Sequence, residues 1–112
     1  MPGDTVSPTY YHAQIARGVS ERELSEWVIE MAVILGWTVW HARDSRGQRL
    51  TGLPDLEMVR GPRRLRAELK TEKGRVSPIQ EATISLLRAS GERVEVWRPS
   101  SWVDGTIEEA LR

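Results

Sequence analysis

The sequence predicts a single α/β domain in which a four-stranded sheet is flanked by helices. Two segments open on capping boxes, and the first of them carries apolar residues at spacings of three and four, which is typical of an amphipathic helix. Four short segments of high β-propensity alternate in side-chain character, as strands do. A chain of 112 residues has room for one modest core and not for two.

The first predicted helix follows an irregular N-terminal arm at residues 1–19. Ser20 and Glu23 have the spacing of a capping box, and the apolar stripe that follows runs to Leu35. Gly36 is expected to end this helix as a left-handed C-cap. Residues 37–41 alternate as a strand, and residues 42–53 form a loop whose length indicates a functional role.

The next two strands form a hairpin whose register follows from its turn. Residues 56–59 and 65–69 flank Gly61-Pro62, a turn pair because glycine accepts positive φ and proline fixes its own. An even loop pairs positions whose numbers sum to 123, which sets Asp55 opposite Glu68. One face of the hairpin is then apolar, and an odd loop would destroy that partition. The other face carries Asp55, Glu57, Arg66, Glu68 and Lys70.

The last third of the chain predicts a helix, a strand and a short helix. After a linker at residues 71–76, Ser77 is an N-cap with Pro78 at the first helical position and Gln80 as the capping-box partner. This helix runs to about residue 90. Residues 94–97 alternate as a strand, and a final helix opens at Ser100 or Ser101 and ends near residue 111.

Composition restricts the kinds of site this chain can hold. Cysteine is absent and only two histidines occur, which excludes disulfides and thiolate zinc sites. A metal would therefore be held mostly by oxygen, which suits Mg²⁺, Mn²⁺ or Ca²⁺. No apolar run has the length of a signal peptide core or a membrane span, so an intracellular, cytoplasmic protein is expected.

The net charge is zero, but the charges are segregated along the chain. Residues 43–75 carry 10 basic and 5 acidic side chains, whereas the segments before and after are net acidic. The basic third contains the predicted carboxylate pair. A basic rim around an acidic centre suits phosphodiester cleavage, because the rim attracts the backbone while the carboxylates hold a cation. A solvated arginine-rich surface is the alternative.

Asp55, Glu68 and Lys70 form the candidate reactive group. Two carboxylates at about 4 Å repel by roughly 4 kcal/mol at an effective dielectric near 20, so a positive charge must balance them. Lys70 alone could do so as a structural partner. A metal ion is the functional alternative, with the lysine beside a nucleophilic water, a role that its tunable amine fits better than a guanidinium.

These motifs, in this order, resemble the VRR-NUC (virus-type replication-repair nuclease) domains of the PD-(D/E)XK superfamily. The resemblance rests on Gly52–Leu56, on Ala67–Gln80 with its Glu-Leu-Lys and Ser-Pro-Ile-Gln motifs, and on Val94–Pro99. The helix start at Glu21-Arg22-Glu23 and the segment Gly36–His41 also fit. The resemblance covers residues 20–105. It implies a restriction-endonuclease-like core with a mixed four-stranded sheet and one nuclease domain at residues 20–112.

The resemblance also implies roles for particular residues. Asp55, Glu68 and the Leu69 backbone carbonyl would bind Mg²⁺ or Mn²⁺, and Lys70 would orient or activate the attacking water. Glu23 would match the family's helix-borne acid, with Glu26 as a substitute. Gln80 would match a helix-borne glutamine near the scissile phosphate. Glu23 and Gln80 each occupy the N3 position of a capping box, which explains them equally well.

Candidate phosphate contacts come from the basic third of the chain, and such contacts would position DNA without reading its sequence. His41 lies at a strand end beside the basic loop and is a further candidate, with packing at the sheet edge as its alternative. The basic candidates are Arg43, Arg46, Arg49, Arg63, Arg64, Lys73 and Arg75.

The sequence therefore predicts a metal-dependent endonuclease that hydrolyses phosphodiester bonds in DNA. The resemblance extends this to structured or branched DNA of the Holliday-junction kind, to phage, mobile-element or DNA-repair settings, and to a homodimer. One alternative is a DNA-binding protein that keeps the nuclease fold without activity. Another is an accessory α/β protein with an arginine-rich face.

Overall fold

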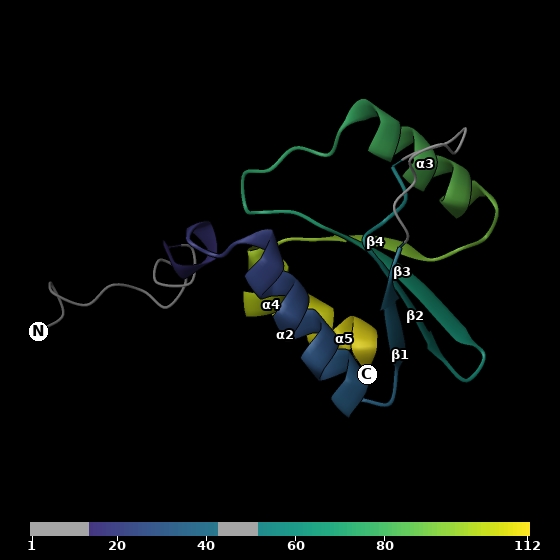
Figure 1. Ribbon diagram of the computed structural model, residues 1–112, viewed down its shortest axis with the longest axis horizontal. Coiled ribbons are helices and arrows are strands. Elements are labelled where there is room, and N and C mark those ends of the chain that lie inside the picture. The colour runs from purple at the N-terminus through teal and green to yellow at the C-terminus, as the bar shows by residue number, and fades with distance from the viewer. Residues whose placement is uncertain (1–13, 43–51) are drawn as a thin grey trace, which may run out of the picture.

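The computed structural model describes residues 14–42 and 52–112 (Figure 1). A helical turn at residues 14–17 precedes the elements of the body of the domain. These are α2 (Glu21–Ile34), β1 (Thr38–His41), β2 (Leu56–Arg60), β3 (Arg63–Leu69), α3 (Pro78–Ala89), β4 (Val94–Trp97), α4 (Pro99–Val103) and α5 (Thr106–Leu111). The predicted α/β class is confirmed.

The four strands form one mixed sheet in the order β1-β2-β3-β4. The first three strands are antiparallel neighbours, and β4 lies parallel to β3. A parallel neighbour cannot be reached by a tight turn, so the chain crosses over between them through α3. The mixed sheet that the family resemblance implied is therefore confirmed.

The hairpin register is the one calculated from the turn. Glu57 pairs with Arg66 and Leu56 with Ala67, and the pairing closes at Arg60 and Arg63 around a two-residue turn. Gly61 in that turn has φ +57°, a conformation that side chains with a Cβ rarely adopt. The apolar and polar faces of the hairpin are thus separated as predicted.

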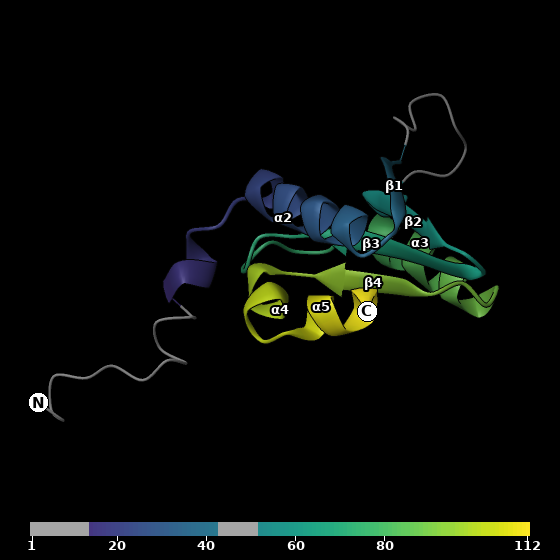
Figure 2. The same ribbon diagram turned by 90° about the horizontal axis from the view of Figure 1, so that it is seen from below.

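One face of the sheet carries the core. Helices α2 and α5 bury their apolar side chains against it, and Trp97 of β4 belongs to the same cluster. Figure 1 shows α3 on the opposite side of the sheet from α2, α4 and α5, and Figure 2 shows α2 lying beside the α4–α5 pair. The buried cluster includes Leu24, Val28, Ala32, Leu56, Met58, Leu65, Ala67, Leu69, Ile107 and Leu111.

Two arginines of the hairpin tie the helix ends to the sheet. Arg60 Nη1 donates to the carbonyl oxygens of Leu35 and Leu111 at 2.9 Å each. Arg63 Nη2 donates to the Ala110 carbonyl at 3.1 Å. Both guanidinium groups also lie over the Trp37 ring, 4.8 and 5.0 Å from its centroid. The last carbonyls of a helix have no partner within the helix, so these donors satisfy them, together with Trp37 Nε1, which donates to the Leu111 carbonyl at 2.8 Å.

Two predicted elements differ from the structure. The irregular arm is wrong at residues 14–17, which are helical, with Ala16 and Val19 buried nearby; residues 1–13 lie outside the described part. The single final helix is wrong because Gly105, at φ +85°, divides it into α4 and α5. Asp104 Oδ1 accepts the Thr106 N–H at 2.9 Å, which starts the second helix.

The predicted loop at residues 42–53 is described only at its two ends. Within residues 14–42 and 52–112, no helix has both the length and the apolar character needed to span a bilayer.

Candidate functional site

Asp55 and Glu68 come together on the face of the sheet opposite the core. Asp55 directly precedes β2, and continuing the observed register sets it opposite Glu68 near the end of β3. The Asp55 Oδ2 atom accepts a hydrogen bond from the Leu69 backbone N–H at 2.8 Å. The Ala42 N–H donates to the Asp55 carbonyl oxygen at 2.9 Å, so Asp55 is held from both neighbouring strands.

The Leu69 carbonyl lies on the same side of β3 as Asp55. Within an antiparallel ladder the N–H and C=O groups of one residue face the same neighbouring strand. The Leu69 N–H bonds the Asp55 carboxylate, whereas the next residue, Lys70, donates its N–H to Trp97 of β4 at 3.0 Å. The Leu69 carbonyl is therefore directed to the β2 side of β3, the side on which Asp55 lies, and its role as an oxygen ligand stays a prediction.

Glu68 is an almost fully buried acid, with 1% of its surface exposed. Its Oε2 atom accepts a hydrogen bond from Gln80 Nε2 at 3.0 Å and lies 3.5 Å from Lys70 Nζ. As a carboxylate, its buried Oε1 atom has no hydrogen-bond donor among the described residues. A buried charge without a hydrogen-bond partner is costly, which makes this oxygen a candidate ligand for a cation.

Burial accordingly changes the proton affinity of Glu68. Loss of hydration, the largest cause, and the nearby charge of Asp55 together raise the pKa of this carboxyl from 4.5 to about 7. Lys70 acts in the opposite sense, because its ammonium favours the ionised form. Glu68 thus changes charge near neutral pH, which a solvated glutamate does not do.

The side-chain amide of Gln80 both completes a helix cap and contacts Glu68. Its Oε1 atom accepts the Ser77 N–H at 2.9 Å, and its backbone N–H donates to Ser77 Oγ at 3.2 Å, which completes the predicted capping box of α3. Its Nε2 atom meanwhile donates to Glu68. The helix cap and the contact with Glu68 are therefore made simultaneously by opposite ends of the amide, and a catalytic role for Gln80 stays a prediction.

Gly52 permits the chain before β2 to lie against the start of α3. It has φ +82°, and a Cβ built there would lie 3.0 Å from the Ile79 carbonyl oxygen and 3.1 Å from the Gln80 backbone nitrogen. A side chain would force these backbones apart. Glycine at this position therefore sets the spacing between the segment that carries Asp55 and the helix that carries Gln80.

Glu23 lies at the exposed N-terminus of α2. Its Oε1 atom accepts hydrogen bonds from Ser20 N and Ser20 Oγ at 3.2 and 3.0 Å, so the predicted capping box is present. Glu26 pairs with Arg22 at 3.3 Å. No group of three or more acidic or histidine side chains suited to a metal occurs within the described residues. A metal role for Glu23 stays a prediction.

The loop between β3 and α3 is bound to the start of α4. Arg98 Nη1 donates to the carbonyl oxygens of Thr71 and Gly74 at 2.7 and 2.6 Å, with a longer contact to Glu72 at 3.3 Å. Glu72 Oε2 in turn accepts the Ser100 N–H at 2.9 Å. These bonds hold the chain that leaves Lys70 in one conformation. The sequence did not predict them, because Arg98 carries no local sign of its distant partners.

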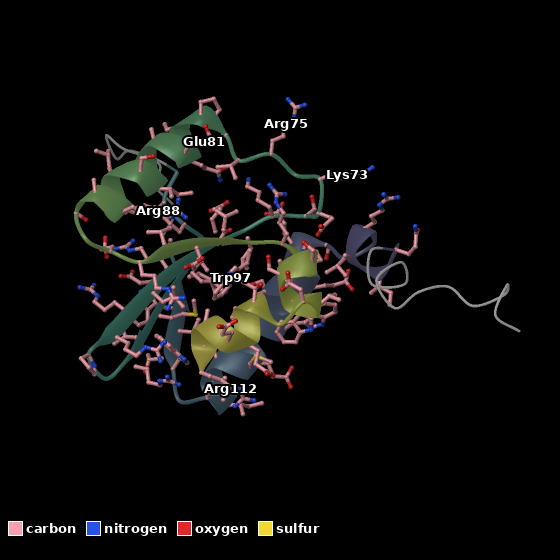
Figure 3. The ribbon with its side chains drawn as sticks, turned by 180° about the vertical axis from the view of Figure 1, so that it is seen from behind. Lys73, Arg75, Glu81, Arg88, Trp97 and Arg112 are labelled. Carbon is pink, nitrogen blue, oxygen red and sulfur yellow. The ribbon has the colours of Figure 1, made fainter. Side chains whose placement is uncertain are left out.

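Lys73 and Arg75 extend from this loop into solvent, as Figure 3 shows. Both line a groove of about 420 Å³ together with Glu72, Val76, Glu81 and Arg98. The groove begins close to Lys70 in the sequence and continues toward α3. Two predicted phosphate contacts therefore line one exposed groove formed by the loop that follows Lys70.

The remaining basic candidates are distributed differently. Arg63 is engaged at the end of α5. Arg64 is exposed and lies 3.6 Å from Glu57. His41 is exposed at the end of β1 and pairs with Leu56 in the register. Arg43, Arg46 and Arg49 lie outside the described residues.

Fold and site together define an α/β domain with a mixed four-stranded sheet and a carboxylate pair, a lysine and a glutamine on its partly open face. A solved structure titled "VRR_NUC domain" has a similar fold, with a TM-score of 0.68 and 24% sequence identity over 80% of this chain and 97% of that chain. A scan against protein-family models and a search of curated proteins found no match. The fold that the motifs predicted is therefore confirmed.

Proposed function

We propose that this protein is a metal-dependent endonuclease that hydrolyses phosphodiester bonds in DNA. The observation that carries the proposal is Glu68, a buried carboxylate with one oxygen that has no donor among the described residues, beside a second carboxylate on Asp55. Buried acids are arranged this way where a cation completes their coordination. The fold similarity to a VRR_NUC domain supports the same conclusion.

The residues present fit a hard divalent cation. Asp55 and Glu68 offer carboxylate oxygens, and the Leu69 carbonyl is directed to the same place. Mg²⁺ and Mn²⁺ prefer such oxygen ligands and keep several waters, so few protein ligands suffice. When bound, the ion supplies Lewis acidity that activates water and polarises a phosphoryl oxygen.

The side chains around this position have separate tasks. Gln80 holds Glu68 Oε2 through its amide and so fixes the direction of the carboxylate. Lys70, with its side chain 13% exposed, is poised 3.5 Å from the same oxygen, where its ammonium can orient the attacking water and balance negative charge on the phosphate. Lys73 and Arg75, on the groove of the loop that follows Lys70, hold the DNA backbone by charge.

The test is cleavage of plasmid DNA with Mg²⁺ or Mn²⁺ by the full chain and by Asp55→Ala and Glu68→Ala. Both variants are expected to lose cleavage while remaining folded by circular dichroism. Glu95→Ala, which removes an acid paired with Arg93 on β4, is the matched control and should cut normally. Undiminished cleavage by either site variant would refute the proposal.

A second candidate is a DNA-binding protein with this fold and no activity. The observation in its favour is that the described residues contain no third acid beside the pair. Such a protein would bind DNA with steep salt dependence but bind no Mn²⁺. Isothermal titration of Mn²⁺ into the wild type and Glu68→Ala separates the two, because the endonuclease predicts a site that the variant lacks.

The motif resemblance further supports structured or branched DNA as substrate, a role in DNA repair or phage replication, and a homodimer as the active form. Labelled linear, nicked, flapped and four-way substrates should be cut at different rates, with branched DNA cut fastest. Light scattering should give twice the mass of the 12.7 kDa chain. Equal rates on all substrates, or a monomer, would each refute the corresponding part.

A further inference from the structure

In the part of the chain that the structure describes, the face of the sheet that carries the carboxylates is covered on one half only. Helix α3 packs against β4 and reaches Glu68 through Gln80, so it covers the β3–β4 half. On the β1–β2 half, Thr38 and Trp40 are exposed, and Glu57 and Val59 are partly exposed. This uncovered half adjoins the site, because β2 begins directly after Asp55.

Trp40 lies on this uncovered half, in a position diagonal to Asp55. It pairs with Glu57 in the β1–β2 register, and paired residues share a face of the sheet. Asp55 precedes Glu57 by two residues and therefore lies on the same face. The pairing of Trp40 with Asp55 is then diagonal, a relation that corresponds to about 7–8 Å between Cα atoms.

Trp40 differs from the other four tryptophans, all of which lie in the described residues. Trp37 and Trp97 are 4% and 1% exposed, and Trp27 and Trp102 pack on each other at 5.5 Å against the core. Trp40 is 43% exposed and does not belong to that core cluster. Its large apolar ring is thus presented to solvent on the face that holds the site.

The ring is also held in one orientation. Trp40 Nε1 donates to Glu57 Oε2 at 3.1 Å, which satisfies its only donor. Glu57 is fixed in turn by Arg66 at 3.3 Å and by Arg64 at 3.6 Å. Arg66 is shared with Glu92, which lies 3.2 Å from its Nε atom, while the guanidinium of Arg64 is exposed on the same face. The result is an oriented indole with an exposed cationic side chain nearby.

We propose that Trp40 is a stacking platform for an unpaired nucleobase, and that the site acts on DNA with an unpaired nucleotide beside the cleaved bond. The proposal rests on the nuclease function proposed above. A free π-face accepts any base, so an exposed aromatic ring binds single strands with little sequence preference. Bases inside a duplex are stacked on one another and offer no free face, so an intact duplex does not use the platform.

The test compares binding of a gapped duplex, which has a short single-stranded stretch, with binding of the intact duplex of the same sequence. Fluorescence anisotropy is measured without divalent ions, so that nothing is cut, and at one salt concentration. The proteins are the full chain, Trp40→Ala, Trp40→Phe and Ile34→Ala. Ile34 is an exposed apolar residue of α2, on the core side of the sheet, and is the control for lost apolar surface.

Trp40→Ala should weaken binding of the gapped duplex by about 5- to 150-fold, the effect of losing one base–aromatic stack. Its binding of the intact duplex and its Mn²⁺ affinity should stay within about twofold of wild type. Trp40→Phe keeps an aromatic face but loses the bond to Glu57, and should retain most of the binding. Ile34→Ala should bind both substrates normally.

Three outcomes would overturn the inference. If Trp40→Ala weakens binding of gapped and intact DNA equally, the ring supports the fold or contacts the DNA backbone and does not stack on a base. Unchanged binding in Trp40→Ala would show that no base stacks there, and conversion of a dimer to a monomer would assign the ring to a protein interface. If the wild type cuts intact DNA and any of these three outcomes is found, only the stacking role of Trp40 is refuted. A wild type that neither binds nor cuts DNA refutes the proposed nuclease function as well.

Discussion

Replacing Glu68 with glutamine is expected to stabilise the metal-free protein at high pH while abolishing metal binding. Glu68→Gln keeps an oxygen that accepts from Gln80 and presents an amide N–H₂ in place of the protonated oxygen, so the variant imitates the neutral acid. The substitution therefore removes the cost of ionising a buried group without creating a cavity. A residue retained only for stability would not behave in this way.

The size and sign of the effect follow from the raised pKa. The folded protein holds the Glu68 proton more tightly, with a pKa of about 7 against 4.5 for the ordinary group. The contribution of Glu68 to the free energy of unfolding is therefore fully present below pH 4.5 and is lost as the pH rises to about 7, because Glu68 ionises at lower pH in the unfolded chain than in the folded protein. A shift of this size corresponds to about 3 kcal/mol. Glu68→Gln has no such dependence, so its advantage should grow by about that amount between pH 4 and pH 8.

Urea unfolding with a chelator present, at several pH values, measures this difference directly, since all other titrating groups are shared by the two proteins. Glu95→Gln is the control for a partly exposed paired acid and should follow the wild type. Adding Mn²⁺ at pH 8 should reverse the order, because an ion at 1,000 times its Kd stabilises the wild type by about 4.1 kcal/mol, which exceeds the advantage of the variant, and leaves the variant unaffected. Parallel stability curves for wild type and Glu68→Gln would refute the reasoning.

Three further substitutions test how the site is supported. Gly52→Ala should lower the free energy of unfolding by about 3 kcal/mol, as denaturant unfolding can measure, and should weaken Mn²⁺ binding. Its control is Gly91→Ala, at φ +94° with open space around it, which should lower the free energy of unfolding by only about 1–2 kcal/mol. Arg98→Lys should cost about 1–2 kcal/mol and raise the Kd for DNA, with the Mn²⁺ affinity by calorimetry unchanged, because Arg98 bonds loop carbonyls and not the carboxylates. Arg60→Ala should cost about 2–4 kcal/mol in thermal or urea unfolding and leave the salt dependence of DNA binding unchanged, since its guanidinium is occupied by carbonyls of Leu35 and Leu111; a shallower salt slope would mean that it contacts phosphate.

The elements that could be predicted are those whose signals are local. The turn at Gly61-Pro62 fixes which residues of β2 and β3 are opposite, and the hydrophobic pattern excludes the alternative register, so the placement of Asp55 near Glu68 followed from about fifteen adjacent residues. The capping boxes at Ser20 and Ser77 are equally local and are both present. Gly105 is a local signal of the same kind that the sequence analysis did not use: it follows Asp104 at the end of α4 and separates α4 from α5.

The features that could not be predicted depend on contacts between distant parts of the chain. Arg60 and Arg63 were counted as free positive charge, yet their partners are carbonyls at the ends of α2 and α5, between 25 and 51 residues away in the sequence. A charge count cannot distinguish an arginine that satisfies a helix end from one that faces solvent. Lys73 and Arg75 were counted in the same way, and the structure leaves these two exposed. Among the described residues, fewer of these basic side chains are free to contact DNA than the sequence indicated.

Gln80 shows why a structural explanation for a residue does not exclude a chemical one. From the sequence, helix capping and a role in the site are alternative explanations for Gln80, because a residue at the N3 position of a capping box is already explained by the cap. The amide has two ends, however, and the cap uses the oxygen while Glu68 receives the N–H₂ group. Glu23 caps α2 in the same position, but its carboxylate has only acceptor oxygens, and one of them already binds Ser20 at the exposed end of the helix. A glutamine at N3 can thus connect a helix start to a buried carboxylate in a way that a glutamate cannot, which is a physical reason for the two capping boxes of this chain to differ at this residue.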